Sequence, residues 1–318
     1  MKIILPAAIA DSLAPKLPSE VEVIWVSEAG GIDGEIADAE VYCNDPEFNR
    51  EVHNQVLATA ANLRWYHAAS AGVNHILSDL QTRDIVLTNS AGVFADPIAE
   101  TVVGYILAQA KTFFLLRSQQ TQHQWAQGTD AETDMRELTD QVLLIVGAGG
   151  IGQAIARRAS AFGMRVWGSR RHLRPMESFE RVVGPQDWQA LLPEAHYVVL
   201  TAPLTSETAG MLDRAALGKM RSDAYLINVG RGALVDEAAL IETLSQRRIA
   251  GAALDTVVAE PLPQNSPLWT LENVFITPHV SGLSSRNSDR IAELFLDNLA
   301  RYRQGQPLRN RVKLALGY

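Results

Sequence analysis

The chain has 318 residues, of which 47% are hydrophobic, and its 28 basic against 36 acidic residues give a formal net charge of −8. This length predicts two domains with a core each, and the acidic balance without any basic block argues against nucleic acid as a partner. The single cysteine, Cys43, excludes an intrachain disulfide and fits the cytoplasm, and no stretch has the uncharged apolar length that a membrane span needs.

Residues 1 to about 95 alternate short apolar runs with helical segments, which is the pattern of a small α/β layer structure. The turn 69–74 follows the run around Trp65 and would expose backbone N–H groups. Taken alone, its sequence favours an ordinary strand-to-helix turn. The expected strands are Lys2–Pro6, Val21–Val26, Glu40–Cys43, Leu63–His67 and Ile85–Thr88.

Asp96 and Pro97 read as an N-cap followed by proline at the first helical position. They would open a long apolar helix that runs towards Arg117 and connects the two domains. Residues 121–140 are polar without clear periodicity, so we expect a surface arm or loop there.

An apolar run at residues 141–146 breaks into glycines spaced G-x-G-x-x-G at Gly147, Gly149 and Gly152. The spacing predicts a strand, a tight turn and a helix over 153–162, whose unpaired N–H groups would face a dinucleotide pyrophosphate. Gly150 and Ile151, inside the motif, are expected to bind the cofactor as well. The bare motif is a weak signal, but the flanking strand and amphipathic helix strengthen it.

From there to about residue 280 strands and helices alternate again, which predicts a doubly wound parallel sheet. An amphipathic helix over 284–304 would follow, with its apolar positions in the core. The expected strands are Arg165–Gly168, His196–Thr201, Ala224–Val229, Gly251–Leu254 and Val274–Thr277.

Three polar segments come directly after expected strands, where open α/β sheets bind ligands. The first holds Arg231 between two glycines, and its guanidinium suits a carboxylate, although this segment taken alone favours a surface arginine in a glycine turn. Glu260 and His279 stand in the other two. They would form a carboxylate–imidazole pair that fixes the ring tautomer, or else be a capping glutamate and a structural histidine.

Six segments, in order along nearly the whole chain, resemble the signatures of the D-isomer-specific 2-hydroxyacid dehydrogenases. The likeness is greatest to the glyoxylate/hydroxypyruvate reductase branch. The segments are SAGVN at 70–74, the glycine motif, PLTSETAGML at 203–212, LINVGRGALVDEAAL at 226–240, ALDTVVAEPLP at 253–263 and ITPHVSG at 276–282.

This resemblance implies a Rossmann-type cofactor domain at 96–284, inserted into a flavodoxin-like substrate domain made of residues 1–95 and 285–318, both doubly wound. It implies that Arg231 binds substrate, that His279 is the acid/base and that Glu260 is its partner. Relatives pair through their cofactor domains, which implies a homodimer with the helix at Pro97 as the contact. The substrate carboxylate would lie on Ala71, Gly72 and Val73, and the cofactor would also contact Val229 and Asp255.

Two positions depart from the family pattern. Asn74 stands where many relatives carry Asp, which argues against a role for charge in that turn. At the end of the second strand of the cofactor domain, where NAD-linked relatives carry an acid for the ribose 2′-hydroxyl, this chain has Arg170 between Ser169 and Arg171. Without that acid we expect NADPH as the preferred cofactor, with NAD possible.

The sequence thus predicts an oxidoreductase that reduces a small 2-keto acid to the D-2-hydroxy acid with NADPH and without a metal. The substrate turn 67–74 and the strand end 41–45 offer no lysine or arginine for a phosphate, and Asp45 stands there instead. Glyoxylate and hydroxypyruvate are therefore the leading substrates. The alternatives are an NAD(H)-linked dehydrogenase of a bulkier keto acid, a non-enzymatic corepressor-like sensor and, less well matched because it typically carries glutamine at position 260, a formate dehydrogenase.

Overall fold

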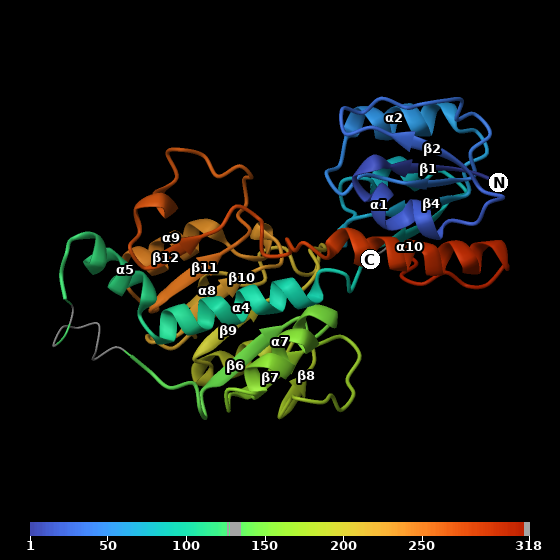
Figure 1. The fold of residues 1–318 in the computed structure, drawn as a ribbon. Coiled ribbons are helices and arrows are strands. Elements are labelled where there is room, and N and C mark those ends of the chain that lie inside the picture. The colour runs from blue at the N-terminus through green and yellow to red at the C-terminus, as the bar shows by residue number, and fades with distance from the viewer. Residues whose placement is uncertain (126, 128–134, 315–318) are drawn as a thin grey trace. The chain divides into compact units, whose positions relative to one another are not determined.

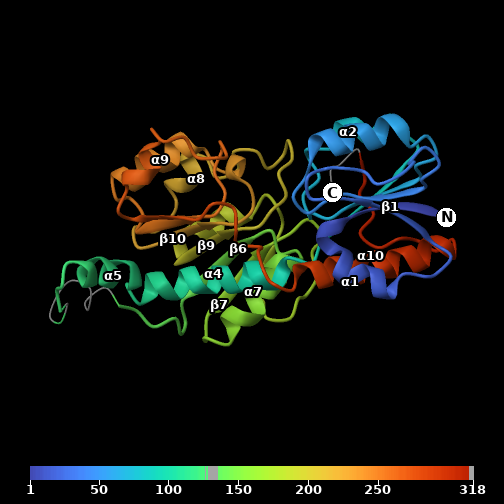
Figure 2. The same ribbon diagram turned by 45° about the horizontal axis from the view of Figure 1, so that its top comes forward.

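The computed structural model describes residues 1–125, 127 and 135–314. The chain divides into two compact units: unit 1 comprises Met1–Phe94 and Ser284–Tyr318, and unit 2 comprises Ala95–Leu283. Each unit is an α/β structure built on one parallel sheet (Figures 1 and 2).

Unit 1 has a five-stranded parallel sheet in the order β2-β1-β3-β4-β5, which is the flavodoxin-like order. Helix α2 covers one face of this sheet, and α1 and α10 cover the other (Figure 1). Side chains alternate between the faces: Val41 packs in the cluster with α1 and α10, and the next residue, Tyr42, packs in the cluster with α2. The strands are β1 Lys2–Pro6, β2 Glu22–Val26, β3 Val41–Cys43, β4 Trp65–Ala68 and β5 Val86–Asn89. The helices are α1 Ala10–Leu13, α2 Arg50–Thr59, α3 Leu77–Leu80 and α10 Asn287–Arg303, with 3₁₀ turns η1 Ala7–Ile9 and η2 Ala14–Lys16.

Helix α10 brings the end of the chain back onto the N-terminal sheet. Its residue Phe295 is fully buried and stacks on Trp65 of β4, with ring centroids 5.1 Å apart. Burial of large aromatic surface between segments 230 residues apart in the sequence makes the two parts one folding unit.

Unit 2 has a seven-stranded parallel sheet in the order β12-β11-β10-β9-β6-β7-β8, the Rossmann order extended by one strand. Its strands are β6 Val142–Val146, β7 Arg165–Ser169, β8 Arg181–Val183, β9 Tyr197–Leu200, β10 Tyr225–Asn228, β11 Gly251–Leu254 and β12 Val274–Ile276. Its helices are α4 Ala95–Ala110, α5 Phe113–Thr121, α7 Gly150–Ser160, α8 Arg214–Leu217 and α9 Glu237–Ser245, with 3₁₀ turns η3 Trp188–Glu194, η4 Gly232–Leu234 and η5 Pro267–Thr270.

The predicted fold class is confirmed: both sheets are parallel and doubly wound, and the Rossmann unit interrupts the flavodoxin-like one. The reason is visible in β6, whose five residues VLLIV are all buried because helices cover both faces of the sheet. Helix α4 lies beside α7 on one of these faces (Figure 1). Arg158 of α7 binds Asp96 and Glu100 of α4 at 3.0 and 3.2 Å.

Four details of the sequence-based prediction were wrong. The long apolar helix is broken, because α4 ends at Ala110 and α5 starts at Phe113 after a 66° bend at Thr112, whose φ is 53°. Asp96 lies inside the first turn of α4 instead of capping it. The helix after the glycine turn begins at Gly150 and not at residue 153. The short edge strand β8 was not predicted. The arm expected at 121–140 lies partly outside the described residues.

In the described part of the chain no single helix has the length and hydrophobicity needed to cross a membrane. The bent pair α4 and α5 meets those two criteria only when both helices are counted together.

His67 on β4 predicts acid sensitivity of unit 1. Its side chain is fully buried, with Nδ1 2.8 Å from Thr88 Oγ1 and Nε2 3.3 Å from Ser90 Oγ, and burial lowers its pKa to about 3. The unfolded chain therefore binds a proton at this residue below about pH 6.5 while the folded chain does not.

We expect this one group to cost about 1 kcal/mol of stability between pH 6.5 and pH 5.5, because the unfolded chain is already half protonated at pH 6.5. Urea unfolding of the wild type and of His67→Gln at both pH values measures it, because the variant lacks the titrating group. Equal losses of stability in the two proteins would contradict the prediction.

Candidate active site

The glycine-rich turn joins β6 to α7 in unit 2. Gly147 has φ of 109°, and a Cβ there would lie 2.5 Å from Ala202 N; a Cβ at Gly152 would lie 2.7 Å from Gly147 O. These two positions therefore need glycine for packing. A Cβ at Gly149 or Gly150 would meet no atom within 4 Å, so the space in front of the first turn of α7 is open. The N–H groups of that turn, at Gly150, Ile151 and Gly152, have no partner within the helix and suit a pyrophosphate.

The end of β7 lies next to the glycine-rich turn and is hydrogen-bonded to it. The buried Ser169 accepts hydrogen bonds at its carbonyl from Gly147 N and Ala148 N, at 3.1 and 2.8 Å. Arg170 follows, with Nη1 3.0 Å from Met176 Sδ and with a buried Nε that has no hydrogen-bond partner among the described residues. Arg171 donates to Glu207 at 2.5 Å. The end of β7 and the two residues that follow it, Ser169 to Arg171, therefore carry two arginines and no acid.

The turn after β10 holds Arg231. Asn228, the last residue of the strand, accepts from Gly230 N at 3.1 Å and donates to Arg231 O at 3.0 Å, so its amide clamps the turn. Arg231 is half-buried, and its Nη1 donates to Gly230 O at 2.7 Å. A Cβ at Gly232 would lie 2.0 Å from the carbonyl carbon of Val257. The arginine turn therefore packs directly on the loop after β11.

Asp255 begins that loop and organises the loop after β12. Its buried carboxylate accepts from Thr277 Oγ1 at 2.6 Å, from Val280 N at 2.9 Å and from Ser281 N at 3.1 Å. Tyr105 of α4 adds a hydrogen bond of 2.7 Å to Thr277 Oγ1, and burial raises the pKa of Tyr105 to about 12. Because most of the Asp255 acceptor positions are taken by protein groups, this side chain holds the loop in place whatever else it binds.

His279 lies in the loop thus held, in the left-handed region with φ of 56°. Its N–H donates to Asp255 O and Thr277 O, at 2.9 and 3.0 Å, which supports this conformation. The ring Nδ1 lies 2.8 Å from Glu260 Oε2, and the other carboxylate oxygen accepts from Val257 N at 3.2 Å. With Nδ1–H donated to the carboxylate, Nε2 is left to exchange a proton with a ligand.

The turn 69–73 in unit 1 presents free backbone donors. Asn89 Nδ2 donates to Ala71 O at 2.7 Å, Ser70 Oγ donates to Gly72 O at 2.8 Å, and Val73 is buried. The N–H groups of Gly72 and Val73 make no hydrogen bond within the described residues. Two adjacent unpaired donors in a fixed turn are what a carboxylate needs.

The structure brings Arg231, Glu260, His279 and Asp255 together at the carboxyl edge of the unit 2 sheet, near Val229, which donates to Leu200 O. Sequence reasoning placed Asn228 and Thr277 in polar segments at strand ends without giving them a role, and it missed Tyr105. Asn228 had a signal, since it is the polar last residue of a buried strand. Tyr105 had none, because its partner is 172 residues away.

Residues 103–281 match the family model of the NAD binding domain of D-isomer specific 2-hydroxyacid dehydrogenases. Over 315 residues the chain is 33% identical to glyoxylate/hydroxypyruvate reductase B of Pectobacterium carotovorum subsp. carotovorum (strain PC1), which covers 98% of this chain and 97% of that protein.

Two solved structures agree over the full length. A D-isomer specific 2-hydroxyacid dehydrogenase family protein from Aeromonas salmonicida subsp. salmonicida A449 is 30% identical with a TM-score of 0.85, covering 98% of this chain and 99% of that one. A D-isomer specific 2-hydroxyacid dehydrogenase from Xanthobacter autotrophicus Py2, solved with NADPH and MES, is 26% identical with a TM-score of 0.87, covering 100% and 99%. With its NAD(P)-binding domain matched and its motifs in register, this chain belongs to the D-isomer specific 2-hydroxyacid dehydrogenases, a family of oxidoreductases, and is similar to its glyoxylate/hydroxypyruvate reductase branch.

Proposed function

We propose that the protein reduces small, unphosphorylated 2-keto acids to D-2-hydroxy acids with NADPH, with glyoxylate and hydroxypyruvate as the leading substrates. One observation carries the proposal: Glu260 holds Nδ1 of His279 at 2.8 Å, which leaves Nε2 as a proton donor on the sheet edge that also carries Arg231. The name of the relative from Pectobacterium carotovorum supports this choice of substrates. The cytoplasm is the proposed location.

In this proposal unit 2 binds the cofactor and unit 1 receives the substrate carboxylate. The bound nicotinamide cofactor supplies the hydride that C2 of the keto acid accepts. Arg231 of unit 2 binds the carboxylate and polarises the ketone. His279 gives a proton from Nε2 to the ketone oxygen, and the negative charge of Glu260 stabilises the protonated ring before transfer.

Steady-state assays of glyoxylate, hydroxypyruvate, pyruvate and 3-phosphohydroxypyruvate with NADPH and with NADH test the proposal. We expect the highest kcat/KM for glyoxylate or hydroxypyruvate with NADPH. A clear preference for the phosphorylated compound, or for a bulky keto acid with NADH, would favour a different dehydrogenase. Binding of NADPH without turnover of any keto acid would favour the non-enzymatic sensor.

We further propose a homodimer formed through unit 2. Helix α5 places Phe113, Phe114 and Leu115 at its start, and these side chains are 54%, 37% and 40% exposed. Three adjacent large apolar residues on one helix favour burial against a second copy.

Light scattering at micromolar concentration is expected to give the mass of two chains, and Phe113→Glu should shift the protein towards one chain. Arg117→Glu, one turn further along the same helix, is the charge control. A monomeric wild type would exclude this assembly.

A further inference from the structure

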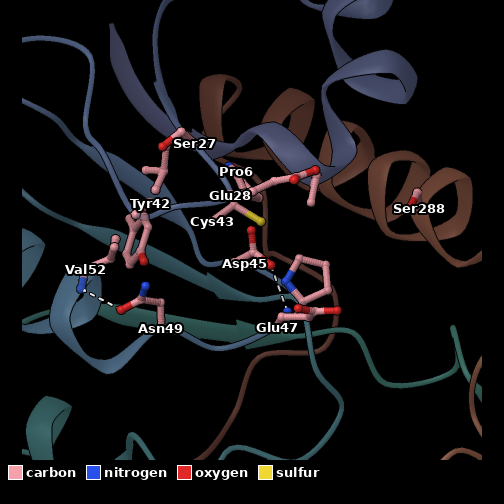
Figure 3. Close-up of a pocket in the computed structure, with 14 residues that line it drawn as sticks. Pro6, Ser27, Glu28, Tyr42, Cys43, Asp45, Glu47, Asn49, Val52 and Ser288 are labelled. Atoms are coloured by element: carbon pink, nitrogen blue, oxygen red, sulfur yellow. Dashed lines mark hydrogen bonds between the residues drawn. The ribbon is translucent and has the colours of Figure 1, made fainter.

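A pocket of about 400 Å³ opens at the carboxyl edge of the unit 1 sheet. It is lined by residues that end or follow β1, β2 and β3 (Figure 3). The sheet order β2-β1-β3 reverses its winding between β1 and β3, and that reversal is where open α/β sheets bind ligands. Its size is that of a small-molecule site.

The charge of the pocket is negative and uncompensated. Glu28 follows β2, Asp45 and Glu47 follow β3, and the lining contains no lysine or arginine. In the described ranges of the chain, none of these three carboxylates forms an ion pair. Burial, with the neighbouring charges of Glu47 and Glu28, raises the pKa of Asp45. Asp45 is half-buried, and Glu28 and Glu47 are exposed. Like charges that gather without a cation favour binding of a cation from outside.

A second observation is independent of these acids. Tyr42, the middle residue of β3, lines the pocket (Figure 3) and is only 2% exposed. Its hydroxyl forms no hydrogen bond to any described residue, and burial raises its pKa, so it keeps its proton. The hydroxyl oxygen is not one of the buried unpaired atoms of the described residues, so it is accessible from the pocket. Its open acceptor positions suit an N–H donor of a ligand.

A hydrogen bond and a strand pairing connect the pocket to the turn that carries the N–H groups of Gly72 and Val73. Asn44 stands between the lining residues Cys43 and Asp45, and its Oδ1 accepts from Ala69 N at 2.8 Å. Strand β3, which ends in the pocket, pairs directly with β4, which leads into the turn. A ligand whose carboxylate lies on the N–H groups of Gly72 and Val73 can therefore extend its other end along the same edge.

We propose that this pocket receives the cationic end of a longer 2-keto acid, so that the enzyme selects guanidinium- or ammonium-bearing keto acids over neutral and anionic ones of equal length. The proposal rests on the proposed function and adds its side-chain specificity. A metal ion is a poorer occupant, because the described residues contain no group of three or more His, Cys, Asp or Glu side chains with metal-binding geometry. A planar guanidinium can instead bridge several separated acceptors.

The test compares three keto acids of similar length with NADPH: 5-guanidino-2-oxopentanoate, its neutral isostere 5-ureido-2-oxopentanoate, and the anionic 2-oxoadipate. We expect kcat/KM for the guanidino compound to exceed that for the ureido compound by roughly tenfold or more, since charge-assisted hydrogen bonds contribute on that order. 2-Oxoadipate should be the poorest. Equal values for the guanidino and ureido compounds would overturn the proposal.

Two variants locate the effect. Asp45→Asn combined with Glu47→Gln should bring the guanidino-to-ureido ratio close to one, and Glu28→Gln, at an exposed position, should lower it partly. Asp84→Asn, an exposed acid at the opposite edge of the same sheet, is the matched control and should keep the wild-type ratio. Because the ratio is taken within each variant, a general loss of active protein does not change it.

Activity with glyoxylate distinguishes a failure of the pocket assignment from a failure of the proposed function. If glyoxylate is reduced but the ratio is near one in the wild type, or survives in the double variant, only the pocket assignment fails. If no 2-keto acid is reduced, the proposed function fails and this specificity fails with it.

Discussion

His279→Ala is expected to lower kcat for glyoxylate reduction by roughly 10²- to 10⁴-fold, the usual contribution of a positioned general acid. In the proposed mechanism Nε2 of His279 protonates the ketone oxygen, because Nδ1 is bound to Glu260. The affinity for NADPH, measured by fluorescence titration, should change little, since the glycine turn and Arg170 are untouched. His123→Ala, at an exposed histidine of the same unit, is the control. Near wild-type turnover of His279→Ala would assign the proton donor to another residue.

Glu260→Gln tests whether the negative charge of Glu260 contributes to the action of His279. The amide keeps the size of the carboxylate and can still accept from Nδ1, so the ring orientation should persist. Without the negative charge the ring loses its charge-assisted partner, so kcat for glyoxylate reduction should fall. Steady-state kinetics of the variant and the wild type in the same buffer measure the loss. An unchanged kcat would mean that Glu260 acts on His279 through geometry alone.

Replacing Arg170 and Arg171 together by alanine is expected to abolish a preference for NADPH over NADH of roughly ten- to a hundredfold in kcat/KM. Arg170 occupies the position after β7 where an acid would repel the 2′-phosphate, and its Nε is a buried donor without a partner among the described residues. Arg171 forms an ion pair with Glu207 that is exposed on both sides and therefore weak enough to be exchanged for a phosphate.

The loss should appear as a higher KM for NADPH with little change for NADH, because only the phosphorylated cofactor makes these contacts. Arg165→Ala is the matched control, since Arg165 starts the same strand at the opposite edge of the sheet and pairs with Glu180. Equal specificity constants for the two cofactors in the wild type, unchanged in the double variant, would contradict the prediction.

The sequence was sufficient for most strands and for the order of the turns that carry the candidate site. Buried parallel strands such as β6 are uninterrupted apolar runs, so their composition alone marks them. The edge strand β8 escaped detection because only one of its sides is paired and its residues RVV are half exposed. The break between α4 and α5 escaped it too, since the run from Val102 to Leu116 is largely apolar and Thr112 carries no turn signal.

Residue types and spacing likewise marked Arg231, Glu260, His279 and the glycine turn, because each follows a strand whose end can be read from its pattern. Their support could not be read in this way. Three supporting contacts each join residues that are 25 positions apart and follow different strands. They are the packing of Gly232 on Val257, the hydrogen bond from Val280 N to Asp255, and the hydrogen bond from Ala69 N to Asn44. Such contacts depend on which strands become neighbours in the sheet. Strand pairing is a property of the whole packed unit. Only the tertiary structure therefore decides that the N–H groups of Gly72 and Val73 are unpaired among the described residues and that the acidic pocket forms.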